Sequence, residues 1–220
     1  MRTFRSPVTR DFGRIAPFSD AVVAVALTAL VLPLLDIKID QTGGWGTFFR
    51  DYGSELSAFL YGFFVIAIYW AVHHKIWGAA QQCTRVLLWL NLFWLLGIVL
   101  IPFGSVALIE VGDQPALLGS QIYCAILMWT SLTTALIIYV ISNDQRISAG
   151  LIPVQPLWWS MRYIVTWGGM WLAIVVFGQA ALPFLWIPGV LMFVLSRPAV
   201  PGRRAGTDDD ESRQPNTSQG

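Results

Sequence analysis

The sequence predicts an all-α integral membrane protein with six transmembrane helices and both termini in the cytoplasm. Hydrophobic residues make up 55% of the 220 residues and charged residues only 12%, with a mean hydropathy of +0.60. The eleven tryptophans are typical of membrane–water interfaces. Six segments are apolar over a length that approaches or exceeds the roughly 20 residues needed to span a bilayer.

The predicted spans cover residues 17–37, 54–74, 85–107, 115–141, 157–177 and 180–196. Residues 1–16 are predicted to form a cytoplasmic N-terminal arm, and residues 17–197 the six-helix transmembrane domain. Residues 198–220 are polar, charged and almost free of apolar side chains, which predicts a disordered cytoplasmic tail. Pro188 falls within the sixth span, where it predicts either a kink or a helix that begins close to this proline.

The distribution of positive charge supports an even number of spans. With six spans and both termini inside, twelve of the fourteen Lys and Arg residues lie on the cytoplasmic side, as the positive-inside rule requires. The two exceptions are Lys38 and Arg50, between the first and second spans. The first span is interpreted as retained rather than as a signal peptide, because its apolar run is too long and no clear small-residue cleavage site follows it.

Charge and histidine placement exclude some partners and cofactors. The net charge of +1 does not favour a nucleic-acid partner, so the lipid bilayer is the predicted environment. His73 and His74 are adjacent, but they point about 100° apart on a helix. No acidic or thiol cluster joins them, so we expect neither a metal site nor a bound cofactor.

The first span, RIAPFSDAVVAVALTALVLPLL at residues 14–35, holds a carboxylate within an apolar run. At about 100° per residue, one narrow stripe of this helix is shared by Ala21, Val25, Thr28 and Leu32. Asp20 lies about 120° from the centre of that stripe. Because an ionisable residue in a span faces protein or water rather than lipid, Asp20 is predicted to point into its own bundle.

Polar side chains at the same membrane depth are the predicted partners of Asp20. They come from the cytoplasmic ends of the first three spans and comprise Ser19, Trp70, His73, His74 and Asn91. Such groups can donate hydrogen bonds to a carboxylate whose burial without partners is costly. Asp20 is therefore predicted to anchor the first helix.

At these residues the sequence resembles the transmembrane protein 175 family, the endolysosomal and prokaryotic potassium channels. The segment RIAPFSD is similar to the family signature RxxxFSD, and the likeness continues through AVVAVALTALVLP, YWAVHHKIW and LLWLNLFWLLGIVLIPF, over roughly residues 14–107. Pro17 is a departure within the signature, which a first helical turn tolerates. With the signature residues added, the predicted structural polar network comprises Arg14, Phe18, Ser19, Asp20, Trp70, His73, His74 and Asn91.

The resemblance implies a leak-type, potassium-permeable cation channel in a prokaryotic plasma membrane. It implies a pore lined by the first helix, without a carbonyl-type selectivity filter and with a hydrophobic constriction. Carried over by position, the pore-lining residues are Val25, Thr28 and Leu32, and potassium is the permeant ion. One helix cannot surround a pore and the chain has one set of spans, so a homotetramer is implied.

Two other classes of protein stay open at this point. A small secondary transporter would need paired ionisable groups near the midplane and internal repeats, and the sequence displays neither. A membrane-embedded enzyme would need a convergent Ser/His/Asp or metal cluster, and the only polar cluster is the one around Asp20. Passive potassium flux in liposomes, without coupling to a substrate or a proton, distinguishes a channel from both.

Overall fold

The computed structural model describes residues 12–38, 44–78, 80–109, 116–148 and 157–177, together with Phe184 and Ile187. All regular secondary structure within these ranges is helical. Four helices of the described part are long and apolar enough to cross a membrane, at Gly13–Asp36, Trp45–Gly78, Arg85–Leu108 and Leu118–Asn143. The predicted tail lies outside the described residues, as does the predicted sixth span apart from two of its residues.

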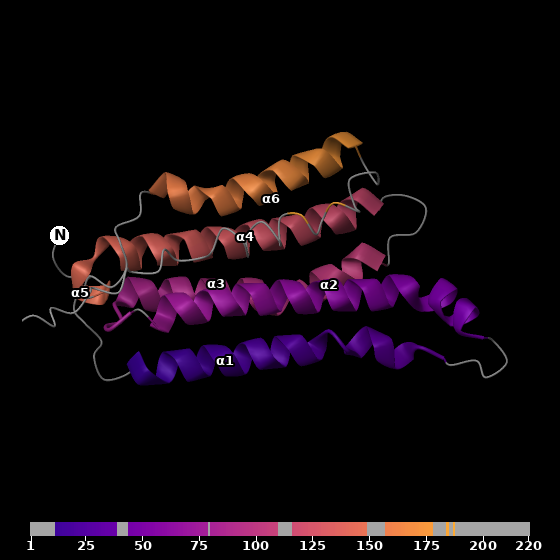
Figure 1. Ribbon diagram of the computed structural model, residues 1–220, viewed down its shortest axis with the longest axis horizontal. Helices are drawn as coiled ribbons and strands as arrows, with labels where there is room; N and C mark the ends of the chain where they lie inside the picture. Colours follow the sequence, from indigo (N-terminus) through magenta and orange to yellow (C-terminus); the bar gives the residue numbers. More distant parts are fainter. Residues whose placement is uncertain are drawn as a thin grey trace, which may run out of the picture.

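The long helices lie side by side in a stack (Figure 1). Their bounds, with the short helices η1 and α5, are α1 Phe12–Ala29, η1 Leu32–Asp36, α2 Trp45–Gly78, α3 Arg85–Ile109, α4 Ala116–Asn143, α5 Gln145–Ser148 and α6 Leu157–Phe177. α1 packs on α2 and α3, α3 packs on α4, and α4 packs on α6. α1 and α6 therefore form the two edges of the described stack, and one long side of α1 is not covered by the other described helices.

Most predicted spans agree with the helices, and the largest differences lie at the starts of the first two. The predicted span 157–177 coincides with α6, and the third and fourth spans differ from α3 and α4 by at most two residues. α2 begins at Trp45 rather than at residue 54. α1 begins at Phe12, inside the predicted arm, so Pro17 lies in the second helical turn rather than the first. Charged residues near each start, Arg14 in α1 and Arg50 with Asp51 in α2, explain both differences, because they lower the local hydropathy by which a span is detected.

The first predicted span is not one continuous α-helix. α1 ends at Ala29, and after a short turn the chain continues as the 3-10 helix η1. Pro33 explains the break, because it has no N–H to donate to the Ala29 carbonyl and its ring collides with that oxygen in an α-helix. The turn is closed by the N–H of Val31 on the Thr28 carbonyl, at 3.1 Å, and by the N–H of Leu34 on the Val31 carbonyl, at 2.9 Å. The helical wheel therefore stops applying at Ala29.

Glycines bring α3 and α4 close together. A Cβ atom added to Gly104 would lie 2.7 Å from the ring of Tyr123, and one added to Gly97 would collide with Thr130. Small residues at helix crossings are typical of membrane bundles, where close packing and hydrogen bonds replace the hydrophobic effect as the source of helix association. α3 is thus held closely to α4, and α3 in turn packs on α1.

Candidate pore face and its supporting polar network

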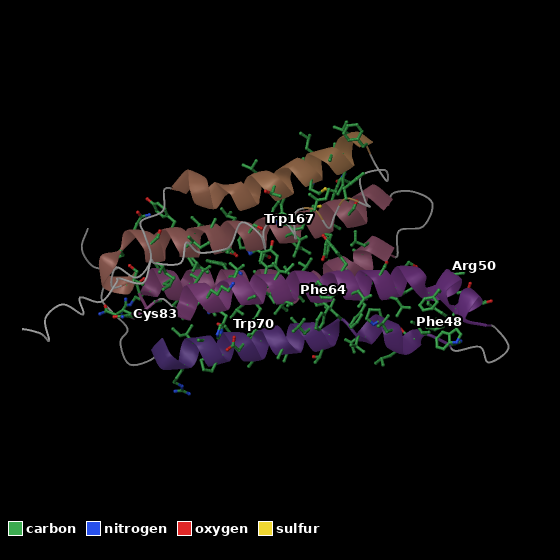
Figure 2. The ribbon with its side chains drawn as sticks, in the orientation of Figure 1. Phe48, Arg50, Phe64, Trp70, Cys83 and Trp167 are labelled. Atoms are coloured by element: carbon green, nitrogen blue, oxygen red, sulfur yellow. The ribbon has the colours of Figure 1, made fainter. Side chains whose placement is uncertain are left out.

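Two adjacent residues of α1 make hydrogen bonds to two different helices. Asp20 Oδ1 accepts a hydrogen bond from Trp70 Nε1 of α2 at 2.8 Å, and Trp70 lies between α2 and α1 (Figure 2). Ser19 Oγ accepts from Asn91 Nδ2 of α3 at 2.9 Å. His73 Nε2 of α2 lies 2.8 Å from Asn91 Oδ1. The polar network therefore ties α1 to α2 and α3 within a single turn of helix.

Ser19, Asn91 and His73 form the buried branch of the network. The direction of each hydrogen bond in this branch follows from Ser19. Its hydroxyl donates to the Ile15 carbonyl at 2.9 Å, so it accepts from the NH₂ group of Asn91. This orients the amide, with Nδ2 toward Ser19 and Oδ1 toward His73. Nε2 of His73 consequently carries the proton in its contact with Asn91. Ser19 and Asn91 are completely buried and His73 is 3% exposed, so each of these bonds replaces water.

The network continues to α4 through an aromatic stack. The ring of His73 stacks on Trp94 of α3, with centroids 3.9 Å apart and planes inclined by 13°. Trp94 Nε1 donates to Thr134 Oγ1 of α4 at 3.1 Å, and Thr134 donates to the Thr130 carbonyl at 2.7 Å. Four helices are thereby connected through one buried chain of contacts.

Three residues of the predicted network occupy other places. Arg14 and Phe18 lie on the exposed side of α1, and 55% of the Phe18 surface is accessible. His74 is also exposed and meets Trp70 by ring contact, with centroids 5.3 Å apart. The signature marks Arg14 and Phe18 by sequence only. Because they are one turn apart on a different face from Ser19, the described part of the chain brings neither of them to the buried branch.

Two members of the network were not predicted from the sequence. Trp94 lies three residues after Asn91, so the two share a face of α3. That spacing is a signal which identifies Trp94 as a neighbour of the network. Thr134 is one of several hydroxyl residues in α4, and no local pattern distinguishes it from the others. Its role follows only from how α3 packs on α4.

A continuous exposed face runs along α1 on the side away from the core. Val25 is 68% exposed, and the neighbouring exposed residues of the face are Ala21, Ala24 and Thr28. Contact with lipid does not require small side chains, whereas close approach of another helix backbone does. The part of the chain that the structure describes therefore leaves the stripe predicted from the helical wheel uncovered, and its composition suits contact with further helices.

Thr28 has oxygen lone pairs available on this face. Its hydroxyl donates to the Val25 carbonyl at 2.7 Å, which is a common arrangement for threonine in a membrane helix. The single hydroxyl proton is thereby directed back to the helix, and the oxygen still has acceptor capacity. An acceptor on an otherwise apolar surface is suited to a cation rather than an anion.

Leu35 joins Leu32 on the exposed side of η1, and the sequence prediction missed it. Leu32 is 61% exposed and Leu35 is 71% exposed. Side chains three residues apart eclipse each other in a 3-10 helix, whereas an α-helical wheel places them about 60° apart. Pro33 was the signal in the sequence that α-helical geometry would end before this point.

Loss of the Asp20 carboxylate is expected to weaken the protein without altering the exposed face. Hydrogen bonds to charged groups are worth more than neutral ones, but Asp20 and Trp70 are both partly accessible. We therefore expect Asp20→Ala to cost about 1 to 2 kcal/mol and Asp20→Asn to cost less. Thermal stability in detergent measures the cost, and Asp51→Ala, at an exposed site on α2, is the control. Equal stability of Asp20→Ala and Asp51→Ala would contradict the anchor role.

The long apolar helices and their buried cross-helix network define a multi-pass helical membrane protein. Residues 14–102 match the family described as endosomal/lysosomal potassium channel TMEM175. This segment contains most of α1, all of η1 and α2, and most of α3. The resemblance to the transmembrane protein 175 family is therefore confirmed over residues 14–102, and the family that this segment matches is one of channels rather than enzymes.

Several named relatives are similar to the chain over part of their length. A potassium channel of Streptomyces collinus is 30% identical over 123 residues, which are 54% of this chain and 58% of the relative. A potassium channel of Chamaesiphon minutus is 29% identical over 126 residues, which are 56% of this chain and 62% of the relative. The human endosomal/lysosomal proton channel TMEM175 is 23% identical, over 57% of this chain and 25% of its own length. The chain thus matches less than two thirds of each of these relatives.

A solved structure shares the fold. It is described as the crystal structure of a lysosomal potassium-selective channel TMEM175 homolog from Chamaesiphon minutus. The TM-score is 0.56 at 23% identity, and the match covers 84% of this chain and 94% of that one. The structural similarity to this channel homolog therefore extends along the chain beyond residues 14–102, the segment that the family match covers.

Proposed function

We propose that the chain is a potassium-permeable, leak-type cation channel whose pore is lined by α1 and η1. The observation that carries the proposal is the uncovered, small-residue face of α1 at the edge of the bundle, directly opposite the polar network. The names of the bacterial relatives support the choice of ion. The proposed setting is a prokaryotic plasma membrane, with six spans and both termini in the cytoplasm.

A homotetramer is the proposed assembly, because a face on one helix encloses a path only when copies of that helix meet around an axis. Closed cyclic symmetry gives each copy the same environment. Small residues at Ala21 and Ala24 permit close approach near the axis. No cofactor takes part, and potassium is the permeant species.

The constriction is proposed to be hydrophobic, without a filter of backbone carbonyls. Rings of Val25 and Leu32 narrow the path and close it by dewetting, and Leu35 adds a further apolar ring. Thr28 places one ring of hydroxyl oxygens between them, which replace part of the water around a cation. Potassium binds its water less strongly than sodium does, so it passes such a constriction more readily.

The proposed function is tested with purified protein in liposomes that hold a potassium gradient. We expect passive flux that dissipates the gradient without an added substrate or proton gradient, together with a detergent-corrected mass of four chains. Flux that requires coupling to another solute would instead indicate a secondary transporter. A stable dimer would remove the geometric basis of the pore.

Thr28→Val is expected to lower the potassium-to-sodium permeability ratio. The substitution keeps the shape of the side chain but removes the only side-chain oxygen of the central stripe, so less of the ion's hydration is replaced. A change of about twofold to tenfold corresponds to less than about 1.4 kcal/mol per ion, which is a reasonable value for a ring of neutral hydroxyls. Bi-ionic reversal potentials measure the ratio. Thr47→Val, at an exposed position near the start of α2, is the matched control. If both variants keep the wild-type ratio, Thr28 does not face the ion path.

A further inference from the structure

Gly62 of α2 forms a notch that receives the side chain of Leu30. A Cβ atom added to Gly62 would lie 2.8 Å from Leu30 Cδ2 and 2.8 Å from Ser105 Oγ of α3. Leu30 is 3% exposed and Ser105 is 4% exposed, so all three meet inside the bundle. The Ser105 hydroxyl donates to the Ile101 carbonyl at 3.1 Å, which directs its proton to its own helix.

The notch lies where the α-helix α1 gives way to the 3-10 helix η1. Leu30 follows the last residue of α1 and stands two residues before Leu32, and η1 itself has no buried residue. Leu30 is consequently the last buried residue of this segment before Leu32 and η1. The hydrogen-bonded attachment at Ser19 and Asp20 lies about 15 Å away along the helix, and the buried residues Val23 and Ala26 of α1 also precede Leu30.

η1 meets α2 along a small pocket, so its position depends in part on how Leu30 is seated. A small cavity lies beside Leu30, lined by Pro33 and Leu34 of the η1 segment, Ala58 of α2 and Ser105 of α3. Close-packed side chains would otherwise determine where a helix rests. Because this space lies beside Leu30, the depth to which Leu30 enters the notch contributes to how far η1 stands from its own bundle.

We propose that Gly62 is a positioning residue for the constriction. By admitting Leu30, it holds η1 back against the bundle and so sets how far Leu32 reaches toward the pore axis. A side chain at position 62 would displace Leu30 and move η1 outward, toward its counterparts in the other copies. The proposal rests on the proposed function, because it assumes that Leu32 faces the axis.

The direct test is Gly62→Ala, with flux normalised to the amount of folded tetramer. The two groups in close contact are the ends of side chains, so the protein is expected to fold with a local shift. Overpacking of this kind has a moderate cost. We expect potassium flux to fall about fivefold, equivalent to about 1 kcal/mol at roughly 1.4 kcal/mol per tenfold.

Two glycine variants separate positioning from general packing. Gly53→Ala on the same helix has nothing within 4 Å of the new Cβ and is expected to leave flux and stability unchanged. Gly97→Ala crowds Thr130 between α3 and α4. It is expected to lower stability without changing the flux of each folded tetramer. Equal flux in Gly62→Ala and Gly53→Ala would overturn the proposal.

A double variant that restores space in the notch provides a further test of this contact. Leu30→Ala removes the δ-carbons, one of the two groups that the new methyl group meets, so the double variant Gly62→Ala with Leu30→Ala is expected to recover part of the lost flux. If Gly62→Ala alone does not assemble, recovery of assembly and flux in the double variant supports the same contact. If the double variant recovers neither assembly nor flux, the result contradicts the proposed contact between position 62 and Leu30.

A readout independent of ion flux distinguishes this proposal from the proposed function. The native cysteines Cys83 and Cys124 are free and buried, so a Leu32→Cys variant provides an accessible thiol for oxidative cross-linking between copies. Adding Gly62→Ala is expected to speed cross-linking, and adding Leu30→Ala as well is expected to reverse the change. An unchanged rate would overturn the positioning role, whereas absence of flux in wild type would overturn the channel function.

Discussion

Asn91→Ala is expected to be the most damaging single substitution within the polar network. Asn91 has no exposed surface and connects two helices to its own, donating to Ser19 and accepting from His73. Its loss leaves both partners buried without that bond, and each unsatisfied group costs about 1 to 3 kcal/mol in soluble proteins. Hydrogen bonds inside membranes are worth less, averaging about 0.6 kcal/mol, because the unfolded state in the bilayer also finds partners.

The total cost of Asn91→Ala should therefore lie near 2 to 3 kcal/mol, since the cavity left by the amide adds to the lost bonds. Fluorescence-detected size exclusion after heating measures it as a melting temperature lower by several degrees. Asn143→Ala is the matched control, because Asn143 lies exposed at the end of α4. If Asn91→Ala and Asn143→Ala have the same melting temperature, the buried branch does not hold α1 in place.

Leu32→Ala is expected to increase ion flux more than any other single substitution in α1 or η1. The side chain is 61% exposed and begins η1. Four leucines replaced by alanine would widen the ring and reduce the apolar surface that excludes water from it. A rise of at least about tenfold corresponds to a barrier lower by only about 1.4 kcal/mol, less than the value of one leucine side chain removed from water.

Leu172→Ala provides the comparison for that increase. Leu172 is similarly exposed, at 56%, but it belongs to α6 at the opposite edge of the stack (Figure 1). Its substitution is expected to leave flux at the wild-type level. Single-channel conductance or liposome flux compares the pair, and equal effects at both positions would show that the exposed side of η1 does not line the pore.

Much of the helical architecture follows from the amino-acid sequence. The spans predicted at 85–107 and 157–177 agree with α3 and α6 within two residues, because an apolar run must remain helical inside a bilayer, where no water pairs the backbone. The start of α2 could not be obtained in this way. Its first turns contain polar residues, and these lower hydropathy without opposing helix formation.

The sequence also determined which parts of α1 face in opposite directions. Helical periodicity separates Asp20 from the stripe of Val25 and Thr28, and the structure turns Asp20 toward Trp70 and leaves the stripe exposed. Periodicity is a local property of the chain, so it needs no knowledge of the other helices. The family signature, by contrast, identified Arg14 and Phe18 as important without indicating that they face outward.

Only the tertiary structure decided how α1 is held and where its geometry changes. The Gly62 notch depends on a side chain 32 residues away and on Ser105, which is 43 residues further along the chain. The hydrogen bond between Trp94 and Thr134 likewise joins two helices. Periodicity gives the direction of a side chain but not the distance to the next helix, and that distance is set by the volumes of residues on both. For this reason the sequence determined which face of α1 is free, and packing decided how far that face stands from its own bundle.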